Sequence, residues 1–182
     1  MAQRTIAATA ISQPQTRSPT MSAFSIRPAE PTDCRAIHEL LMELAEFEKI
    51  THLVEATPSS TRLALFGDQP TAEALVAEVD GATVGVAVFF HNYSTFVGRQ
   101  GLYLEDIYIT PEHRSQGIGK SMITELAKLA TERGCGRMEW TVLDWNRGAI
   151  DFYRNLGGEI LEDWRIVRLN REQIAQIAAS VG

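Results

Sequence analysis

A short basic turn rich in glycine constrains this 182-residue chain more than any other stretch, and it reads Arg114-Ser115-Gln116-Gly117-Ile118-Gly119-Lys120. An alternating apolar segment, 102–110, precedes the turn and an amphipathic segment, 121–133, follows it, which predicts a strand, a turn and a helix. Glycine allows positive φ and lets a ligand approach the backbone closely. The amides of such a turn and of the first helical residues lack intrahelical acceptors, and the helix dipole favours an anion there. The stretch therefore predicts a site for a pyrophosphate-bearing cofactor, with Arg114 and Lys120 adding positive charge.

The charge balance and the apolar runs of the chain exclude two classes of partner. Asp and Glu number 23 against 17 Lys and Arg, for a net charge of −6, whereas generic nucleic-acid binding needs a basic surface. An acidic protein suits a cationic substrate better. The longest apolar runs, such as 83–90, are too short to span a bilayer. We therefore expect neither a nucleic-acid partner nor a membrane partner.

The two cysteines, Cys34 and Cys135, lie far apart in the sequence, and no CxxC motif or Cys/His cluster accompanies them. A disulfide framework or a metal site would need more such residues at closer spacing. We expect two reduced thiols in or near the core, no bound metal and a cytoplasmic location.

Residues 1–23 differ in composition from the rest of the chain. They are rich in Ala, Thr, Ser and Gln and contain Arg4 and Arg17 but no acidic residue. They have no continuous apolar segment for secretion, although a weak organelle-targeting signal is an alternative. We expect a disordered extension over 1–23 and a single domain over 24–182, which is long enough for a hydrophobic core.

The order of apolar periodicities predicts an α/β domain with a mixed sheet. Alternation predicts strands at 24–27, 74–79, 83–91, 102–109, 137–143 and 160–169. Apolar positions three and four residues apart predict helices at 33–49, 57–66, 121–133, 146–156 and 171–179. Asp80-Gly81 predicts a hairpin turn and 92–101 a loop. The early strands would pair antiparallel and the later βαβ units parallel.

The Arg-x-x-Gly-x-Gly turn follows the strand LYLEDIYI and precedes the segment WNRGAIDFYRNLGG, and this combination over 102–158 resembles the GCN5-related N-acetyltransferase (GNAT) family. The glycine spacing differs from that of dinucleotide folds and of the P-loop. Blocks such as FSIRPAEPTDC and DWRIVRL are more closely similar to the diamine N-acetyltransferases, which act on spermidine/spermine and thialysine. This similarity runs from Phe24 to about Ala178. The resemblance implies a central mixed β-sheet with splayed parallel strands flanked by helices. It also implies transfer of an acetyl group from acetyl-CoA to an amine that attacks the thioester directly.

Two side chains would carry the proton transfers by this resemblance. Tyr153 would be the general acid at the thioester sulfur, with packing of its helix on the sheet as the alternative role. Glu105 would act as the base, through water, or as an anchor for the ammonium group. A carboxylate within an apolar strand is costly unless it is paired or useful. Because neighbours on a regular strand point to opposite faces, we expect only one of Glu105 and Asp106 to face a given site, and Asp106 has a structural hydrogen-bond role as its alternative.

The resemblance also implies how acetyl-CoA is bound. Backbone groups of Ile107, Tyr108 and Ile109 would pair with the pantetheine arm as if it were an added strand. The amides of 115–120 would hold the pyrophosphate, with Arg114 lending charge. The cofactor would further contact Asn146, Ala149 and Tyr153.

Four residues match positions that meet the amine in the family: Phe47, Glu48, Glu162 and Trp164. Carboxylates and aromatic faces both suit a cation. A core role for Phe47 and a surface role for Glu48 are the alternatives. The loop Ser94-Thr95-Phe96 lacks the acid and the tryptophan that spermidine-specific enzymes carry there. This departure leaves a shorter diamine or a lysine-like amino acid such as thialysine open as the substrate.

Two further hypotheses keep the fold and change the function. One makes a protein lysine or an α-amine the acceptor, and the other makes the chain a non-catalytic acyl-CoA-binding sensor. Tyr153 and Glu105 count against the sensor. The segment 163–179 resembles the part through which family members dimerise, so we expect a homodimer that acts on a small-molecule amine.

Overall fold

The computed structural model describes residues 23–180, so the predicted extension over 1–23 lies almost entirely outside the described residues. The chain divides into two units, one ending at Trp140 and the other beginning at Thr141, and each is described by itself. The expectation of a single domain over 24–182 stays a prediction.

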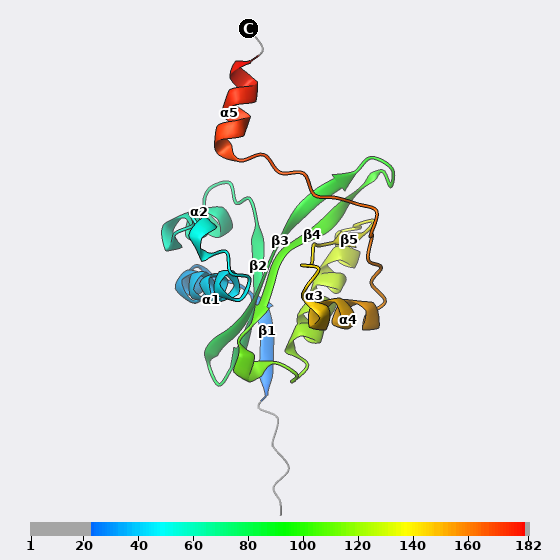
Figure 1. Ribbon diagram of the computed structural model, residues 1–182. Coiled ribbons are helices and arrows are strands. Elements are labelled where there is room, and N and C mark those ends of the chain that lie inside the picture. The colour runs from blue at the N-terminus through cyan, green and yellow to red at the C-terminus, as the bar shows by residue number, and fades with distance from the viewer. Residues whose placement is uncertain (1–22, 181–182) are drawn as a thin grey trace, which may run out of the picture. The chain divides into compact units, whose positions relative to one another are not determined.

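A five-stranded mixed sheet forms the centre of the first unit (Figure 1). Its strands lie side by side in chain order: β1 (Phe24–Pro28), β2 (Glu73–Val79), β3 (Ala82–Ser94), β4 (Arg99–Ile109) and β5 (Met138–Glu139). The first four are antiparallel to their neighbours, whereas β4 and β5 are parallel. The predicted mixed sheet is confirmed.

Helices α1 (Cys34–Phe47) and α2 (Pro58–Phe66) cover one face of this sheet, and α3 (Ile118–Glu132) covers the other (Figure 1). The core below α1 and α2 is a cluster of buried side chains from both helices and three strands, namely Ile37, Leu40, Leu65, Ala74, Val76, Val86 and Tyr108. On the other face α3 buries Ile118, Met122 and Leu126 completely or nearly so. These three residues of α3 lie four positions apart, which is a spacing that keeps them on one helical face.

Capping and turn residues in the sequence predict where α2 begins and where the hairpin of β2 and β3 turns. Thr57 caps α2, since its hydroxyl accepts a hydrogen bond from the Ser60 amide at 3.1 Å, and Pro58 occupies the first helical position. Asp80 and Gly81 both have positive φ, 50° and 80°, as a two-residue hairpin turn requires. Both features confirm the sequence predictions.

The predicted loop at 92–101 is wrong, because most of it is strand. Pairing between β3 and β4 continues out to Ser94 opposite Arg99 and leaves only a short turn between them. Ser94 is buried and closes the turn: its hydroxyl accepts from the Val97 amide at 3.2 Å and its carbonyl from the Gly98 amide at 2.8 Å. Polar residues at this end of the hairpin interrupt the apolar alternation, so the sequence pattern predicted a loop instead of strands.

The second unit contains α4 (Arg147–Asn155) and α5 (Arg171–Ala179), as the sequence predicts. The predicted strand at 160–169 is wrong for the described chain, which has no strand there, and Trp164, Ile166 and Val167 of this segment are exposed. The predicted strand at 137–143 is reduced to the two residues of β5.

Both cysteines are free thiols, Cys34 buried and Cys135 half-buried, as expected. Among the described residues, no helix is both long enough and apolar enough to cross a membrane. The same part of the chain holds no group of three His, Cys, Asp or Glu side chains that could bind a metal ion. The cytoplasmic location stays a prediction.

Candidate active site

The glycine-rich turn has the backbone of an anion site. Ser115 and Gly117 both have positive φ, 61° and 87°, and no side chain caps α3, which begins at Ile118, three residues earlier than predicted. The first hydrogen bond of this helical turn runs from the Ser121 amide to the Gly117 carbonyl at 3.0 Å, so the amides of 118–120 have no acceptor within the helix. A Cβ built on Gly117 meets nothing within 4 Å, so the space beside it is open. The turn therefore fits the pyrophosphate of acetyl-CoA.

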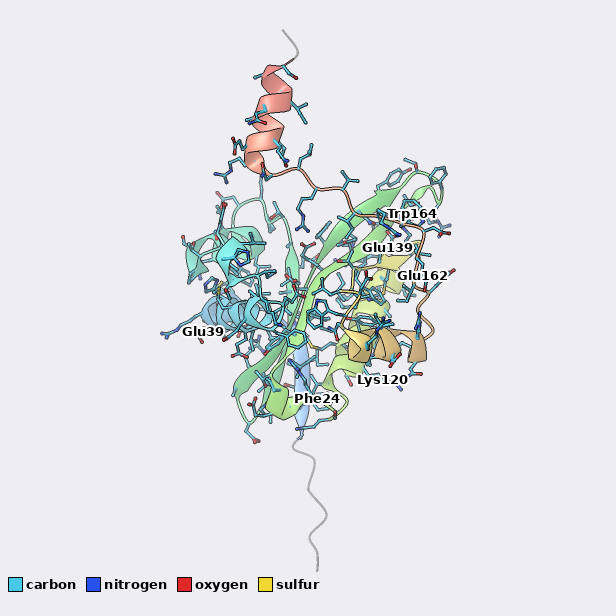
Figure 2. The ribbon with its side chains drawn as sticks, viewed as in Figure 1. Phe24, Glu39, Lys120, Glu139, Glu162 and Trp164 are labelled. Carbon is cyan, nitrogen blue, oxygen red and sulfur yellow. The ribbon has the colours of Figure 1, made fainter. Side chains whose placement is uncertain are left out.

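Short contacts hold this turn in shape. The Gln116 side-chain amide donates to the Glu112 carbonyl at 3.0 Å, and the Thr110 hydroxyl shares a hydrogen bond of 2.9 Å with Nδ1 of His113. Lys120 projects from the first turn of α3 with an exposed side chain (Figure 2). The expectation that Lys120 adds charge for the phosphates stays a prediction.

The Arg114 side chain contacts a backbone carbonyl and two aromatic rings, and its charge at the phosphates stays a prediction. Its Nε donates to the Ile109 carbonyl at 2.9 Å. Its guanidinium carbon lies 5.4 Å from the ring centre of Phe47 and 5.3 Å from that of Tyr108, which is cation–π distance for both. No local sequence pattern predicts these ring contacts, because they join α1, β4 and the turn.

The parallel strands β4 and β5 separate after a short stretch of pairing. Only Leu102 and Tyr103 pair with β5, opposite Met138 and Glu139. Beyond Tyr103, β4 has no β5 partner, and it runs on through the residues proposed to meet pantetheine, Ile107 to Ile109. An unpaired strand edge offers backbone groups to an added strand, which suits the amide-bearing pantetheine arm.

A β-bulge in β4 sets the positions of the two adjacent carboxylates. Leu104 pairs with Phe89 and Asp106 with Val88, so a single step on β3 corresponds to two on β4, and Glu105 is the extra residue. Leu104 and Phe89 are fully buried on one face, whereas Val88 packs against the core below α1. Glu105, following Leu104, points away from Leu104's face, and Asp106 shares the face of Val88.

Regular alternation, on which the expectation of a single site carboxylate rested, is therefore absent here, and the roles of Glu105 and Asp106 at the amine stay predictions. A regular strand would separate them, but the bulge interrupts the alternation. The negative charge of Glu105 also acts on Asp106 directly and raises its pKa. Glu105 is exposed and Asp106 is half-buried, so one lies nearer solvent than the other.

Glu48 belongs to the same electrostatic group. The pKa of Asp106 is raised to about 6, first by burial and then by the charges of Glu105 and Glu48. Burial also raises the pKa of Glu48. Two negative charges thus act on Asp106, no Lys or Arg charge is among the causes of its shift, and such an arrangement favours a proton or a cation.

The end of α1 fixes Glu48 in place. Lys49 adopts positive φ, 62°, and its amide donates to the Glu46 carbonyl at 3.0 Å, while the Ile50 amide donates to the Ala45 carbonyl at 2.8 Å. These two bonds form a Schellman motif with Glu48 as the last cap residue. Lysine in this conformation costs about 1 kcal/mol relative to glycine. The motif fixes the backbone on the C-terminal side of Glu48, and the roles of Phe47 and Glu48 at the amine stay predictions.

In the second unit, Asn146 and Tyr153 are both positioned by α4. The Asn146 side-chain oxygen accepts from the Ala149 amide at 3.2 Å and so caps the helix, a use that the cofactor-binding prediction did not include. Tyr153 is buried, with its ring 5.3 Å from that of Phe152. Burial raises the pKa of the Tyr153 phenol, which keeps it protonated at neutral pH. A proton donor must be in this state.

Glu162 and Trp164 lie on the irregular segment after α4, and both side chains are exposed (Figure 2). Glu162 approaches Arg154 of α4 at 3.7 Å, a long contact for an ion pair. Neither residue is fixed by packing within its unit. Their role at the amine stays a prediction.

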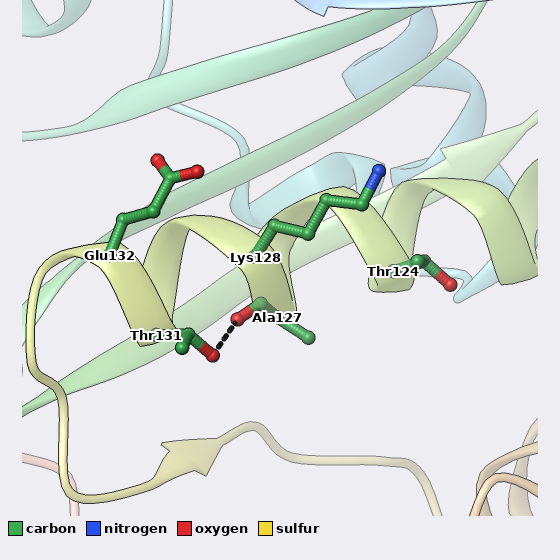
Figure 3. Close-up of a pocket in the computed structure, with 5 residues that line it drawn as sticks. All are labelled: Thr124, Ala127, Lys128, Thr131 and Glu132. Carbon is green, nitrogen blue, oxygen red and sulfur yellow. Dashed lines mark hydrogen bonds between the residues drawn. The ribbon is translucent and has the colours of Figure 1, made fainter.

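A hollow on the outer face of α3 contains none of the predicted site residues (Figure 3). It is lined by Thr124, Ala127, Lys128, Thr131 and Glu132. The Thr131 hydroxyl donates to the Ala127 carbonyl at 2.8 Å, so this polar group is already satisfied by the helix. The hollow holds no group suited to acyl transfer.

Comparison with known proteins gives one family model, two relatives and one solved structure. The model of the acetyltransferase (GNAT) family matches residues 35–157. Thialysine N-epsilon-acetyltransferase of Bos taurus is 38% identical over 169 residues, 87% of this chain and 99% of that protein. L-ornithine N5-acetyltransferase of Arabidopsis thaliana is 32% identical over 84% of this chain and 86% of that protein. The solved ribosomal-protein-alanine N-acetyltransferase of Brucella melitensis biovar Abortus 2308 aligns with a TM-score of 0.66 and 23% identity, over 81% of this chain and 100% of that one, and confirms the fold.

Replacing Asp106 by Asn should stabilise the protein in a pH-dependent way. The folded protein holds the Asp106 proton with a pKa of about 6, against an ordinary value of 3.8. The wild type therefore loses stability as the pH rises from about 4 to about 6, because folding then opposes ionisation. The Asp106→Asn variant has no carboxyl group to ionise at this position, so it does not lose stability in this way as the pH rises. We expect its free energy of unfolding to exceed that of the wild type by up to about 3 kcal/mol at neutral pH and by little below about pH 4.

Urea unfolding across this pH range measures the difference. Asp68→Asn, a change at an exposed aspartate on the turn after α2, is the matched control and should give a small, pH-independent effect. A gain for Asp106→Asn that does not vary with pH would show that Asp106 ionises normally.

Proposed function

The chain belongs to the GNAT family of acetyltransferases, and on that premise we propose that it transfers the acetyl group of acetyl-CoA to a primary amine of a small cationic molecule. The observation that carries the proposal is the group of carboxylates Glu48, Glu105 and Asp106 on the strand and helix end next to the cofactor turn. A bound ammonium group would relieve their repulsion. The acidic net charge of −6 favours the same class of substrate.

Acetyl-CoA supplies an activated thioester carbonyl when bound. The amides of 118–120 and the turn at Ser115 to Gly117 would hold its pyrophosphate. The unpaired edge of β4 at Ile107 to Ile109 would accept the pantetheine arm. By the family resemblance, Asn146 and Ala149 of the second unit would also contact acetyl-CoA.

The chain's own residues would then move the protons. The substrate ammonium would give one proton to Glu105 or Asp106, directly or through water, and the freed amine would form a bond to the carbonyl carbon. The carbon–sulfur bond would break as the Tyr153 phenol gives its proton to the sulfur, and the second proton of the attacking nitrogen would pass through water to the Tyr153 oxygen and restore the phenol. Positioning the amine next to the thioester avoids a covalent enzyme intermediate. The raised pKa of Asp106, about 6, suits a group that takes up a proton near neutral pH.

The acceptor that the observations favour is a lysine-like amino acid, with diamines and polyamines as the other members of the class. The two relatives compared above are named for thialysine and ornithine. The turn between β3 and β4 offers Ser94, Thr95 and Phe96 and no carboxylate for a second distant ammonium. Ser94 is engaged in closing the turn itself.

Coenzyme A release should be clear with one small amine among thialysine, lysine, ornithine, putrescine, spermidine and spermine, and weak with a lysine peptide. Tyr153→Phe should lower kcat about 100-fold on that amine, because the departing sulfur loses its proton donor. The measurement is thiol release followed at a saturating acetyl-CoA concentration.

Tyr93→Phe removes a hydroxyl from an exposed tyrosine of β3 and should leave kcat unchanged. Full activity of Tyr153→Phe would remove the general-acid role. A wild type that binds acetyl-CoA but acetylates none of these amines would instead favour the acyl-CoA sensor.

We also propose that the protein is a homodimer formed through its C-terminal segment. Alternation predicted a strand at 160–169, yet the described chain offers this segment no strand partner. Apolar side chains along it and on α5 are exposed, namely Trp164, Ile166, Val167, Leu169, Ile174 and Ile177. A contiguous exposed apolar stretch of this kind fits an interface, and a second copy would supply the missing strand partner.

Light scattering after size exclusion should give twice the mass of the chain for the wild type and the mass of one chain for Val167→Asp. A charge in the interface would lack a partner there and oppose association. Leu63→Asp, at another exposed apolar position on α2, is the control and should leave the dimer intact. A monomeric wild type would contradict this proposal and leave the catalytic one untouched.

A further inference from the structure

One guanidinium connects three parts of the first unit. Arg114 precedes the glycine turn, its Nε donates to the carbonyl of Ile109 at the end of β4, and its cationic carbon lies over the Phe47 ring at the end of α1. It lies over the Tyr108 ring as well, at 5.3 Å. Arginine suits this task because its planar group can stack on rings while an edge donates a hydrogen bond.

The charges that act on Tyr108 agree with this position of the Arg114 guanidinium. The pKa of Tyr108 is raised by burial and by the negative charge of Glu43 on α1, and lowered by the positive charge of Arg114. Arg114 and Glu43 thus act on the same phenol from opposite directions. Glu43 lies one helical turn before Phe47, so the α1 face that meets Arg114 carries both a ring and an acid.

The contact lies between the two halves of the candidate site. Phe47 is the last residue of α1 and directly precedes Glu48, whose charge acts on Asp106. Arg114 directly precedes Ser115, whose positive φ begins the pyrophosphate turn. A shift of either segment must therefore move or break the stacking of Arg114 on Phe47.

We propose that Arg114 is a positioning residue that couples the cofactor turn to the amine pocket through the ring of Phe47. The stacked guanidinium holds the turn in the conformation that binds pyrophosphate and holds the end of α1 that presents Glu48. Coupling of this kind is reciprocal, so a change at Phe47 must alter the affinity of the turn for coenzyme A. The inference rests on the proposed function for the identity of the amine pocket, but not for the coupling itself.

A simpler role for Arg114 makes a different prediction. If Arg114 only lends charge to the phosphates, removing the ring of Phe47 leaves coenzyme A binding unchanged. The two roles also differ for a lysine at 114, which keeps the charge but loses the planar stack and the bond from Nε.

The test is equilibrium binding of coenzyme A to the full chain by calorimetry, with no amine present. We expect Phe47→Leu to weaken binding about fivefold, the size of an exposed cation–π contact. Arg114→Lys should weaken it by at least as much, and the double variant should bind no more weakly than Arg114→Lys alone. Phe47→Tyr keeps a ring and should bind like the wild type.

Phe96→Leu is the matched control, since Phe96 is 98% exposed on the hairpin turn and should not affect binding. Wild-type affinity in Phe47→Leu, or losses that multiply in the double variant, would overturn the coupling. If coenzyme A binding behaves as expected while no amine is acetylated, the coupling stands and the proposed function fails. A wild type that binds no coenzyme A would overturn both.

Discussion

The extra residue in β4 is the feature on which the candidate site depends. Without the bulge, Glu105 and Asp106 would point to opposite faces of the sheet, and one of them would enter the apolar layer that Leu104 and Phe89 form under α3. The bulge keeps both carboxylates away from that layer and within electrostatic reach of each other. It lies on the strand whose other edge separates from β5, so one irregular strand has both an unpaired backbone edge and two adjacent carboxylates.

The cluster of the carboxylates Glu48, Glu105 and Asp106 lowers the stability of the free protein. Asp106 is half-buried next to two like charges, and its raised pKa measures how strongly the site prefers a proton or a cation. Lys49 adds backbone strain at the end of α1, directly after Glu48. Clusters of this kind are typical of functional sites, where a ligand supplies the missing charge. A bound ammonium group and a transferred proton would each offset the same excess of negative charge around Asp106.

The sequence predicted features that depend on neighbouring residues. The cap at Thr57, the hairpin turn at Asp80-Gly81 and the anion turn around Gly117 each follow from residue types a few positions apart, and the structure contains all three. The pairing register of β3 and β4 was not predictable from neighbouring residues, because the bulge at Glu105 depends on how the two strands lie beside each other. The contact of Arg114 with Phe47 joins residues far apart in the chain, and no local pattern reports it. The strand expected at 160–169 is absent for a related reason: alternation shows that a segment can pair, but not whether a partner strand lies beside it.

The most direct test of this account is the titration of the Asp106 carboxyl carbon by NMR in the wild type, Glu48→Gln and Glu105→Gln. We expect a midpoint near pH 6 in the wild type and a lower midpoint in each variant, because each removes one negative charge that acts on Asp106. A control variant, Glu39→Gln, changes an exposed acid on α1 and should leave the midpoint unchanged. A wild-type midpoint near the ordinary value of 3.8, unaffected by either substitution, would contradict the claim that the bulge joins these carboxylates into one site.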